Sequence, residues 1–249
     1  MEKVKINIKF NSMINRVTFT GADDTTDINE MIELSEKYPF VEWAILVMPG
    51  RYGKDRFPSK DWIRQLVILA AKKVNLSLHL CGKYVNDILV GDDLKVMADV
   101  GASFLYFNRI QINTHGLATF FSEHLMLGLM KSYESKELIF QYDDVNTAIY
   151  AAANAGVNCS ALFDLSHGAG ILPDQWPDLL PNIKCGYAGG LGPDNLVDQI
   201  KAIEEKAGDT PIWIDMETKV RTDREDLGIS IFDLGKVEQC LQLAAPFIR

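Results

Sequence analysis

Groups that can transfer protons or bind anions recur at eight places in the chain, each at the end of a short apolar run. Carboxylates and imidazoles transfer protons, whereas lysines, arginines and glycine amides bind anions. The candidate residues are Thr20, Asp23 and Asp24; Met48 and Arg51; His79, Cys81 and Lys83; Asn108 and Arg109; Gln141, Tyr142 and Asp143; Asp164 and His167; Gly189 and Gly190; and Asp215, Glu217, Lys219 and Arg221. Together these residue types predict acid–base chemistry on a small anionic ligand.

The stretch IKCGYAGGLGPDN (183–195) places two adjacent glycines between an apolar run and the expected start of a helix. Glycine has no Cβ, so a ligand can approach the backbone closely, and the amides at a helix N-terminus attract anions. A helix terminus contributes only about 0.3–1 kcal/mol to an exposed anion, so a cationic side chain is needed as well. The expected phosphate seat comprises Gly189, Gly190, Leu191 and either Lys219 or Arg221. The plainer alternative is a tight turn before a helix that begins at Pro193.

The elements that must position these residues alternate between two patterns. Apolar or β-branched runs, which predict strands, occupy residues 16–21, 41–48, 76–81, 103–108, 137–142, 158–164, 183–190 and 211–216. Segments with helical spacing occupy residues 27–38, 59–74, 116–133, 146–156, 193–208 and 232–247, and several open with Asp, Ser, Asn or Pro. Eight strands about thirty residues apart are typical of a (β/α)8 barrel, whose ligands bind at the carboxyl ends of the strands. An open doubly wound sheet is the competing fold.

The composition predicts one globular domain over residues 1–249, with a short extended N-terminal segment before the first strand. The chain is 47% hydrophobic and carries a net charge of −9, which argues against nucleic acid or an anionic membrane as a partner. Neither a signal peptide nor an 18-residue apolar run is present in the sequence, so we expect a cytoplasmic protein. Its four cysteines are widely spaced, as expected of reduced thiols in a core. We expect a phosphorylated metabolite as ligand, no cofactor and no bound metal, and the chain could form a homodimer.

Several of these motifs resemble those of the phosphoribosylanthranilate isomerase family. The likeness is best over residues 150–220 and is carried by YAGGLGPDNL, ALFDLSHGAGI, LHLCG and WIDMETKV. It implies a phosphate-binding (β/α)8 barrel that converts an N-aryl ribosylamine phosphate to its 1-deoxyribulose form. By this resemblance Asp164 matches the general acid of the family, and Gly189 and Gly190 match its phosphate loop.

The chain departs from the family pattern at three places. Thr18 and Thr20 stand where the family has the lysine and the catalytic cysteine of its Lys-x-Cys-Gly motif. The acidic stretch ADDTTD replaces an expected arginine, and METK replaces a Ser-Gly turn. A threonine hydroxyl is a poor base at neutral pH. These departures indicate a divergent relative that acts on a different substrate.

An aldose-to-ketose shift needs an acid and a base on either side of the reacting carbons. With Asp164 as acid, the candidate bases are His79, which we expect to titrate near pH 7, and the loop carboxylates Asp23 and Asp24. A structural histidine inside the barrel is an equal alternative for His79. The expected substrate-binding residues are Asn108, Gln141, His167 and Asp215.

Three further alternatives remain open from the sequence. A metal-dependent lyase or hydrolase would use His79, Asp164, His167, Asp215 and Glu217. A Schiff-base aldolase would need a lysine inside a strand, but Lys184 lies at the start of its strand, the wrong end of a barrel. The third alternative is a non-catalytic barrel that binds a phosphorylated metabolite. The basic, aromatic segment 51–62 could serve as a lid or as a subunit contact.

Overall fold

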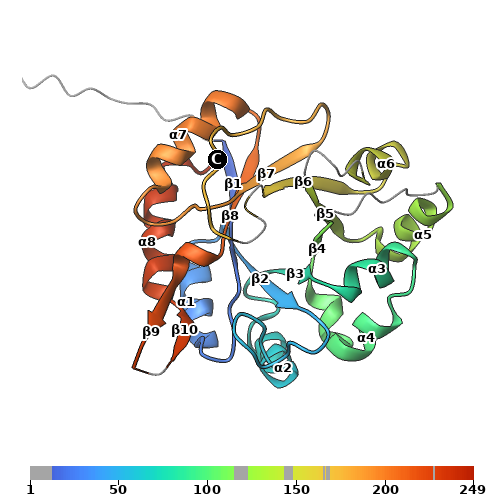
Figure 1. Cartoon of the computed structure of the whole chain (residues 1–249), viewed down its shortest axis with the longest axis horizontal. Helices are drawn as coiled ribbons and strands as arrows, with labels where there is room; N and C mark the ends of the chain where they lie inside the picture. Colours follow the sequence, from blue (N-terminus) through green and yellow to red (C-terminus); the bar gives the residue numbers. More distant parts are fainter. Residues whose placement is uncertain (1–12, 115–122, 143–147, 165, 167–168, 227) are drawn as a thin grey trace, which may run out of the picture.

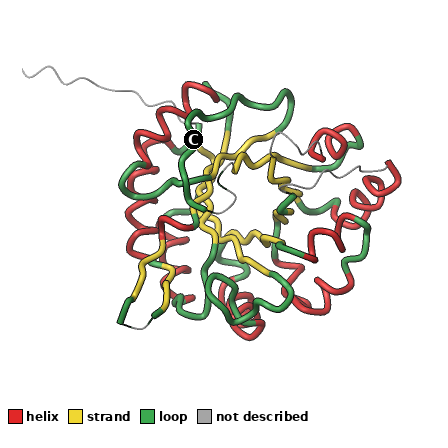
Figure 2. Tube along the Cα trace, viewed as in Figure 1, coloured by secondary structure: helices red, strands yellow, loops and turns green. Residues whose placement is uncertain are grey.

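A closed ring of eight parallel strands, ordered around the barrel as they follow along the chain, forms the centre of the protein (Figures 1 and 2). The computed structural model describes residues 13–114, 123–142, 148–164, 166, 169–226 and 228–249, so the predicted extended segment at the N-terminus lies outside the described residues. The barrel strands are β1 (Ile14–Thr20), β2 (Val41–Val47), β3 (Asn75–Leu80), β4 (Arg109–Ile112), β5 (Glu137–Tyr142), β6 (Cys159–Asp164), β7 (Lys184–Ala188) and β8 (Ile212–Met216). The predicted (β/α)8 barrel is confirmed, and the open doubly wound sheet is wrong.

Helices surround the ring, but they do not alternate strictly with the strands. They are α1 (Ile28–Lys37), α2 (Lys60–Ala70), α3 (Lys83–Leu89), α4 (Leu94–Val100), α5 (Glu123–Tyr133), α6 (Ala148–Asn154), α7 (Leu196–Ala207) and α8 (Leu234–Ala244). Both α3 and α4 lie between β3 and β4, whereas the described residues of the β6–β7 connection contain no helix. After β8 the chain forms a hairpin of β9 (Arg221–Arg224) and β10 (Ile229–Phe232) before α8.

Polar caps explain where several helices begin. The carboxylate of Asp27 accepts a hydrogen bond from the Asn29 amide at the start of α1, and the Ser59 hydroxyl accepts one from the Trp62 amide at the start of α2. Asp233 accepts two amide hydrogen bonds at the start of α8. Such caps satisfy amides that have no partner within the helix.

The fourth strand does not occupy residues 103–108, as the apolar run predicts. Gly101–Tyr106 form a 3-10 helix, η1, whose Phe104 packs against Tyr133 with ring centroids 6.0 Å apart. The strand instead uses the next residues, Arg-Ile-Gln-Ile, in which polar and apolar side chains alternate. Asn108 is therefore exposed before β4, at the end of the barrel opposite its predicted position, and its role as a substrate-binding residue at the carboxyl end of a strand is wrong.

The barrel interior is lined by small and polar side chains more than by apolar ones. Alternate residues of each strand pack in the main hydrophobic core beneath the helices, and a separate buried apolar cluster joins Ile139, Leu162, Ala188 and Trp213. A Cβ on Gly186 would lie 2.1 Å from the indole of Trp213. Gly186 is therefore glycine because the tryptophan ring fills its side-chain space.

A network of ion pairs crosses the barrel at the end where the strands start. Arg109 Nη1 lies 2.8 Å from Glu42 Oε1, and Arg109 Nη2 lies 3.2 Å from Glu137 Oε1. Arg16 Nη1 pairs with the other oxygen of Glu42 at 2.6 Å. The guanidinium of Arg109 also stacks over Trp213, 4.4 Å from the ring centroid. A cavity of about 590 Å³ opens at this end, but its buried charges are already paired with one another.

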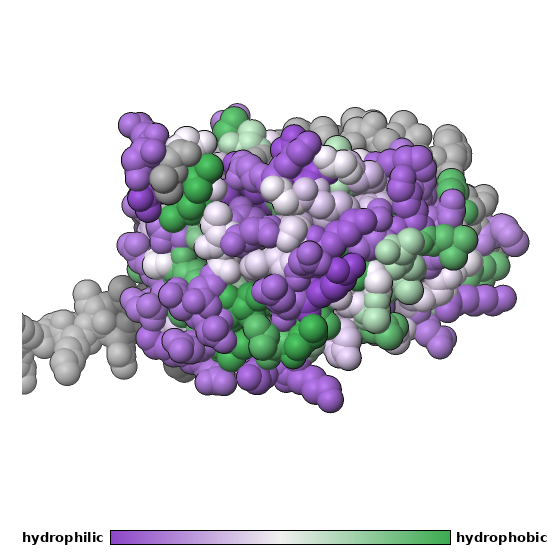
Figure 3. Space-filling view, turned by 90° about the horizontal axis from the view of Figure 1, so that it is seen from below, coloured by the Kyte–Doolittle hydropathy of each residue, from purple (hydrophilic) through white to green (hydrophobic). Residues whose placement is uncertain are grey.

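The outer surface is mostly hydrophilic, with an apolar area on the face that carries α2 (Figure 3). Among the exposed large apolar side chains are Ile68 and Leu69 of α2, and Leu105 and Tyr106 of η1. A groove of about 700 Å³ runs between these two elements. No partner chain is present on this face, and the possible homodimer stays a prediction. In the described part of the chain no helix is long and apolar enough to cross a bilayer.

Candidate functional site

The end of the barrel at which the strands finish, here called the mouth, brings together many of the predicted site residues. Its cavity is lined by His79, Gln111, Asp164, Ser166, Gly189, Gly190, Leu191, Asp215, Glu217 and Lys219, among others. The cavity measures only about 30 Å³, which is room for water rather than for a metabolite. The lining that the structure describes therefore leaves no room for a metabolite.

Asp164 ends β6 and is held by hydrogen bonds from two neighbours. Its Oδ1 accepts from the amide of Ser166 at 3.1 Å and from the Ser166 hydroxyl at 2.8 Å. Its Oδ2 accepts from Gln141 Nε2 at 3.1 Å. Gln141, predicted to bind substrate, thus lies at the end of β5 in a position that orients the Asp164 carboxylate.

Asp215 lies in the same layer of the barrel as Asp164. Strand register pairs Asp164 with Ala188, and Ala188 with Asp215, so the two carboxylates flank one small residue of β7. The hydroxyl of Thr20 donates to Asp215 Oδ1 at 2.8 Å. Burial raises the pKa of Asp215 well above its usual value, against the Thr20 hydrogen bond, and the nearby Glu217 and Asp164 carboxylates raise it further. Asp215 therefore holds its proton to a higher pH than an exposed aspartic acid does.

His79 points into the barrel from β3 as a neutral imidazole. Its Nε2 lies within hydrogen-bond distance of the Gln111 side-chain amide, at 3.1 Å. The Nδ1 atom of His79 is buried and has no hydrogen-bond partner among the described residues. Burial lowers the pKa of His79 to about 4, so the expectation that it titrates near pH 7 is wrong.

The depressed pKa of His79 makes folding stability depend on pH. The folded protein binds this proton less tightly than the unfolded chain, so the free energy of unfolding falls as the pH drops from 6.5 toward about 4. The expected loss is about 3 kcal/mol for a pKa change of this size. Urea unfolding across this range measures it, and His79→Gln should flatten the curve.

The matched control for this measurement is His124→Gln, since His124 is an exposed histidine on α5. This substitution should leave the pH dependence of unfolding as in the wild type. If His79→Gln kept the full dependence, other groups would cause it and the imidazole of His79 would be accessible to solvent.

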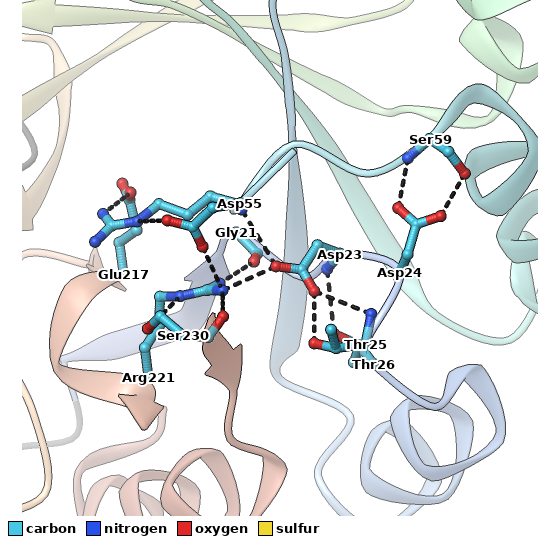
Figure 4. Close-up of polar contacts among 11 residues, drawn as sticks. Gly21, Asp23, Asp24, Thr25, Thr26, Asp55, Ser59, Glu217, Arg221 and Ser230 are labelled. Carbon is cyan, nitrogen blue, oxygen red and sulfur yellow. Dashed lines mark hydrogen bonds and ion pairs between the residues drawn. The ribbon is translucent and has the colours of Figure 1, made fainter. Parts of the chain in front are cut away.

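The two loop aspartates proposed as bases do not line the mouth cavity. Asp23 is 5% exposed and accepts hydrogen bonds from Thr25, from the Arg56 amide at 3.2 Å and from Arg221 Nη2 at 2.9 Å (Figure 4). Asp24 accepts from the amide and hydroxyl of Ser59. Both carboxylates fasten the β1–α1 loop to its surroundings, so their predicted role as general base is not supported by the geometry.

Arg221 is used by the same network and does not line the cavity. Its Nη1 donates to the Gly21 carbonyl at 2.7 Å, and its Nη2 donates to Asp55 at 2.8 Å as well as to Asp23 (Figure 4). The side chain is 2% exposed. Of the two cations predicted for the phosphate seat, only Lys219 lines the mouth cavity.

Close packing within the chain explains why two glycines follow β7. Gly189 and Gly190 have φ values of +113° and +67°, which favour glycine. A Cβ on Gly190 would lie 2.5 Å from the Leu172 amide nitrogen, in the β6–β7 connection. Asn195 Oδ1 already accepts from the Gly192 amide at 3.0 Å, and α7 starts at Leu196 rather than at Pro193. The phosphate seat stays a prediction, because the chain occupies part of the expected space.

One important residue was missed by sequence reasoning. Arg56, in the loop between β2 and α2, donates from Nη1 to Glu217 Oε1 at 2.7 Å and to Thr218 Oγ1 at 3.2 Å. The basic composition of residues 51–62 was its only sequence signal, and it did not tell which arginine reaches the mouth. His167, predicted to contact substrate, lies outside the described residues.

The described residues give no support to a metal centre. Within them, no three histidine, cysteine, aspartate or glutamate side chains converge so that they could hold a metal ion. Burial also raises the pKa of Cys81 at the mouth to about 12, so this thiol stays protonated at neutral pH.

Comparisons with known proteins establish the fold of the chain but not its activity. No protein-family model and no curated protein matches the sequence. Phosphoribosylanthranilate isomerase from Thermus thermophilus is 13% identical and aligns over 92% of this chain and 98% of its own, with a TM-score of 0.58. The corresponding enzyme from Thermotoga maritima is 14% identical over 92% and 98%, with a TM-score of 0.54. Phospho-2-dehydro-3-deoxyheptonate aldolase from Thermotoga maritima is 12% identical over 98% and 73%, with a TM-score of 0.54. The chain therefore has the (β/α)8 barrel fold of these enzymes, and the resemblance of its motifs to phosphoribosylanthranilate isomerases is matched by structural similarity.

Proposed function

We propose that the chain catalyses an acid–base isomerisation of a phosphorylated, sugar-type metabolite at the mouth of the barrel. The observation that carries this proposal is the pair Asp164 and Asp215, placed in one layer on either side of Ala188. Neighbouring strands lie about 4.8 Å apart, so the two Cα atoms are about 10 Å apart. Ala188 places only a methyl group between the two carboxyl groups, so the reacting carbons of a substrate can bind between them once the cavity widens.

The surroundings of the two carboxyl groups suit opposite roles. Asp215, whose pKa is raised, donates a proton to the carbonyl oxygen of the substrate. Asp164, whose two oxygens accept hydrogen bonds from Ser166 and Gln141, removes the proton from the adjacent carbon. These two transfers form an enediol intermediate. Asp164 then returns its proton to the carbon that was the carbonyl carbon, and the hydroxyl on the other carbon gives its proton back to Asp215. The isomerisation is then complete. These roles differ from the family resemblance, which assigns the acid to Asp164.

Thr20 and Lys219 complete the proposed site. Thr20 stands where the related family has its cysteine base, and here its hydroxyl donates to Asp215, so it is a positioning residue. Lys219 lines the cavity beside the glycine turn and contributes a positive charge for the phosphate. The small volume of the cavity requires the surrounding loops to move before a sugar phosphate can enter.

Deuterium exchange across a panel of sugar phosphates tests this function. The assay suits an unidentified substrate, because any compound with a hydrogen on the carbon next to a carbonyl can show exchange. Each compound is incubated with the protein in D2O, and the carbon-bound hydrogens are followed by NMR. At least one compound is expected to exchange the hydrogen next to its carbonyl, and Asp164→Asn should abolish the exchange. A compound that binds tightly but never exchanges would favour the non-catalytic binding barrel instead.

Complementation of a tryptophan auxotroph lacking phosphoribosylanthranilate isomerase should fail, because the strand-1 cysteine is absent.

A further inference from the structure

The charges at the mouth pose a difficulty for any anionic ligand. Three carboxyl groups gather there, and the Asp164 carboxylate raises the pKa values of both Asp215 and Glu217. Lys219 is the cation that lines the same cavity. Even with Asp215 protonated, the Asp164 and Glu217 carboxylates would repel a phosphate placed there, so we expect a second cation besides Lys219.

Arg221 cannot supply the second cation in the structure described. Its guanidinium donates to Asp23, to Asp55 and to two backbone carbonyls, and it is almost fully buried (Figure 4). Withdrawing it would leave the buried Asp23 carboxylate without its ion pair, which is costly. The network around Arg221 therefore serves to hold the mouth loops together.

Arg56 is placed differently, at the edge of the cavity. Its side chain is 27% exposed, and its Nη1 reaches Glu217, which lines the cavity. The residue has a φ of +66°, a left-handed conformation that costs a non-glycine residue on the order of 1 kcal/mol. The backbone amide of Arg56 donates to Asp23, which fixes this conformation and directs the guanidinium toward the mouth.

Glu217 differs from Asp23 as a partner, because its raised pKa allows it to take up a proton when the guanidinium leaves, so no buried charge stays unpaired. Burial raises the pKa of Glu217 even though Arg56 pairs with it, and the Asp164 carboxylate raises it further. Its negative charge is therefore poorly stabilised at this position. In the structure Arg56 Nη1 donates to Glu217 and to Thr218, and its Nε lies 3.8 Å from Asp55 Oδ2. A guanidinium has five N–H groups and binds a phosphate or sulfate through two of them at once, which none of these contacts does.

We propose that Arg56 is the residue that binds the anionic group of the ligand, and that Glu217 occupies its guanidinium until the ligand arrives. This rests on the proposed function only in that the ligand is an anion. Ligand binding exchanges one ion pair for another and releases the β2–α2 loop from Glu217, which lines the cavity. The segment 51–62 then acts as a ligand-responsive part of the mouth.

Sulfate binding tests the exchange because sulfate carries the charge of a phosphate ester and does not titrate near neutral pH. Affinity is measured by isothermal titration calorimetry at constant ionic strength for the wild type and single variants. Arg56→Gln should weaken sulfate binding about 10-fold, the size of one lost charge-assisted hydrogen bond. Glu217→Gln should tighten it by a similar factor, because the competing carboxylate is gone.

Arg64→Gln is the control, since Arg64 is an exposed arginine of α2 outside the β2–α2 loop, where it pairs with Asp61. It should bind sulfate as the wild type does. Tighter binding by Glu217→Gln cannot come from misfolding, so the proposal stays testable if Arg56→Gln is unstable. Unchanged or weaker binding by Glu217→Gln would overturn it. If the sulfate pattern holds while no sugar phosphate exchanges deuterium, the isomerase proposal fails and the role of Arg56 stands.

Discussion

Asp215→Asn is expected to lower kcat about 10²–10⁴-fold on any substrate found by deuterium exchange, the usual range for loss of a positioned acid or base. Asparagine keeps the shape of the side chain and can still contact the Thr20 hydroxyl, but it has no proton to give. The pH dependence of the rate provides the second readout. The wild-type rate should fall at high pH as the raised pKa of Asp215 is passed, and this limb should vanish in the variant.

Two comparisons make this prediction specific to Asp215. Asp226→Asn alters an exposed aspartate that pairs with Arg224 in the β9–β10 hairpin, and it should leave kcat unchanged. Thr20→Val removes the hydroxyl that donates to Asp215, and it should shift the high-pH limb rather than abolish turnover. A full rate in Asp215→Asn would assign the proton donor to another group and contradict the proposed acid.

Arg109→Leu is expected to cost about 3–5 kcal/mol of unfolding free energy, because it leaves buried carboxylates without their partner. Glu42 is fully buried, and Arg109 is 4% exposed between Glu42 and Glu137. For a chain of this size the melting temperature should fall by about 10 °C. Thermal and urea unfolding measure the effect.

Arg16→Leu offers the matched comparison at the same end of the barrel. Arg16 pairs with the same glutamate, but its side chain is 33% exposed, so water replaces part of the lost contact. Its melting temperature should fall by much less than that of Arg109→Leu. If Arg109→Leu and Arg16→Leu had the same melting temperature, water from the adjacent cavity would be reaching Glu42, and the ion-pair network would be solvated.

The strands that the sequence predicts well are those with an apolar run of three or more residues, even where a charged or amide side chain is part of the strand. β2 is buried along its whole length, and its predicted range differs from the observed one by a single residue. The sequence did not predict β4, because its interior residues Arg109 and Gln111 interrupt the apolar run. The aromatic run just before it fits the strand pattern, but it forms a 3-10 helix in which the Phe104 ring packs against Tyr133 of α5.

The candidate site was predictable where a residue ends a strand and unpredictable where it lies in a loop. Asp164 and Asp215 belong to strands, so the barrel register alone places them at the mouth. Asp23, Asp24 and Arg221 lie in or next to loops, and the contacts among those loops decide whether a charge faces a ligand or another side chain. Sequence spacing does not encode contacts between segments almost two hundred residues apart.

The connection between β6 and β7 affects the shape of the mouth more than the stability of the barrel. Its described residues contain no helix, and they dock through side chains, with Trp176 donating to Gln199 at 2.9 Å and packing on Tyr187. Leu172 of the same connection rests against Gly190. Substitutions in this segment that spare Trp176 should therefore change the lining of the mouth, to which Gly170 contributes, more than the packing of the barrel.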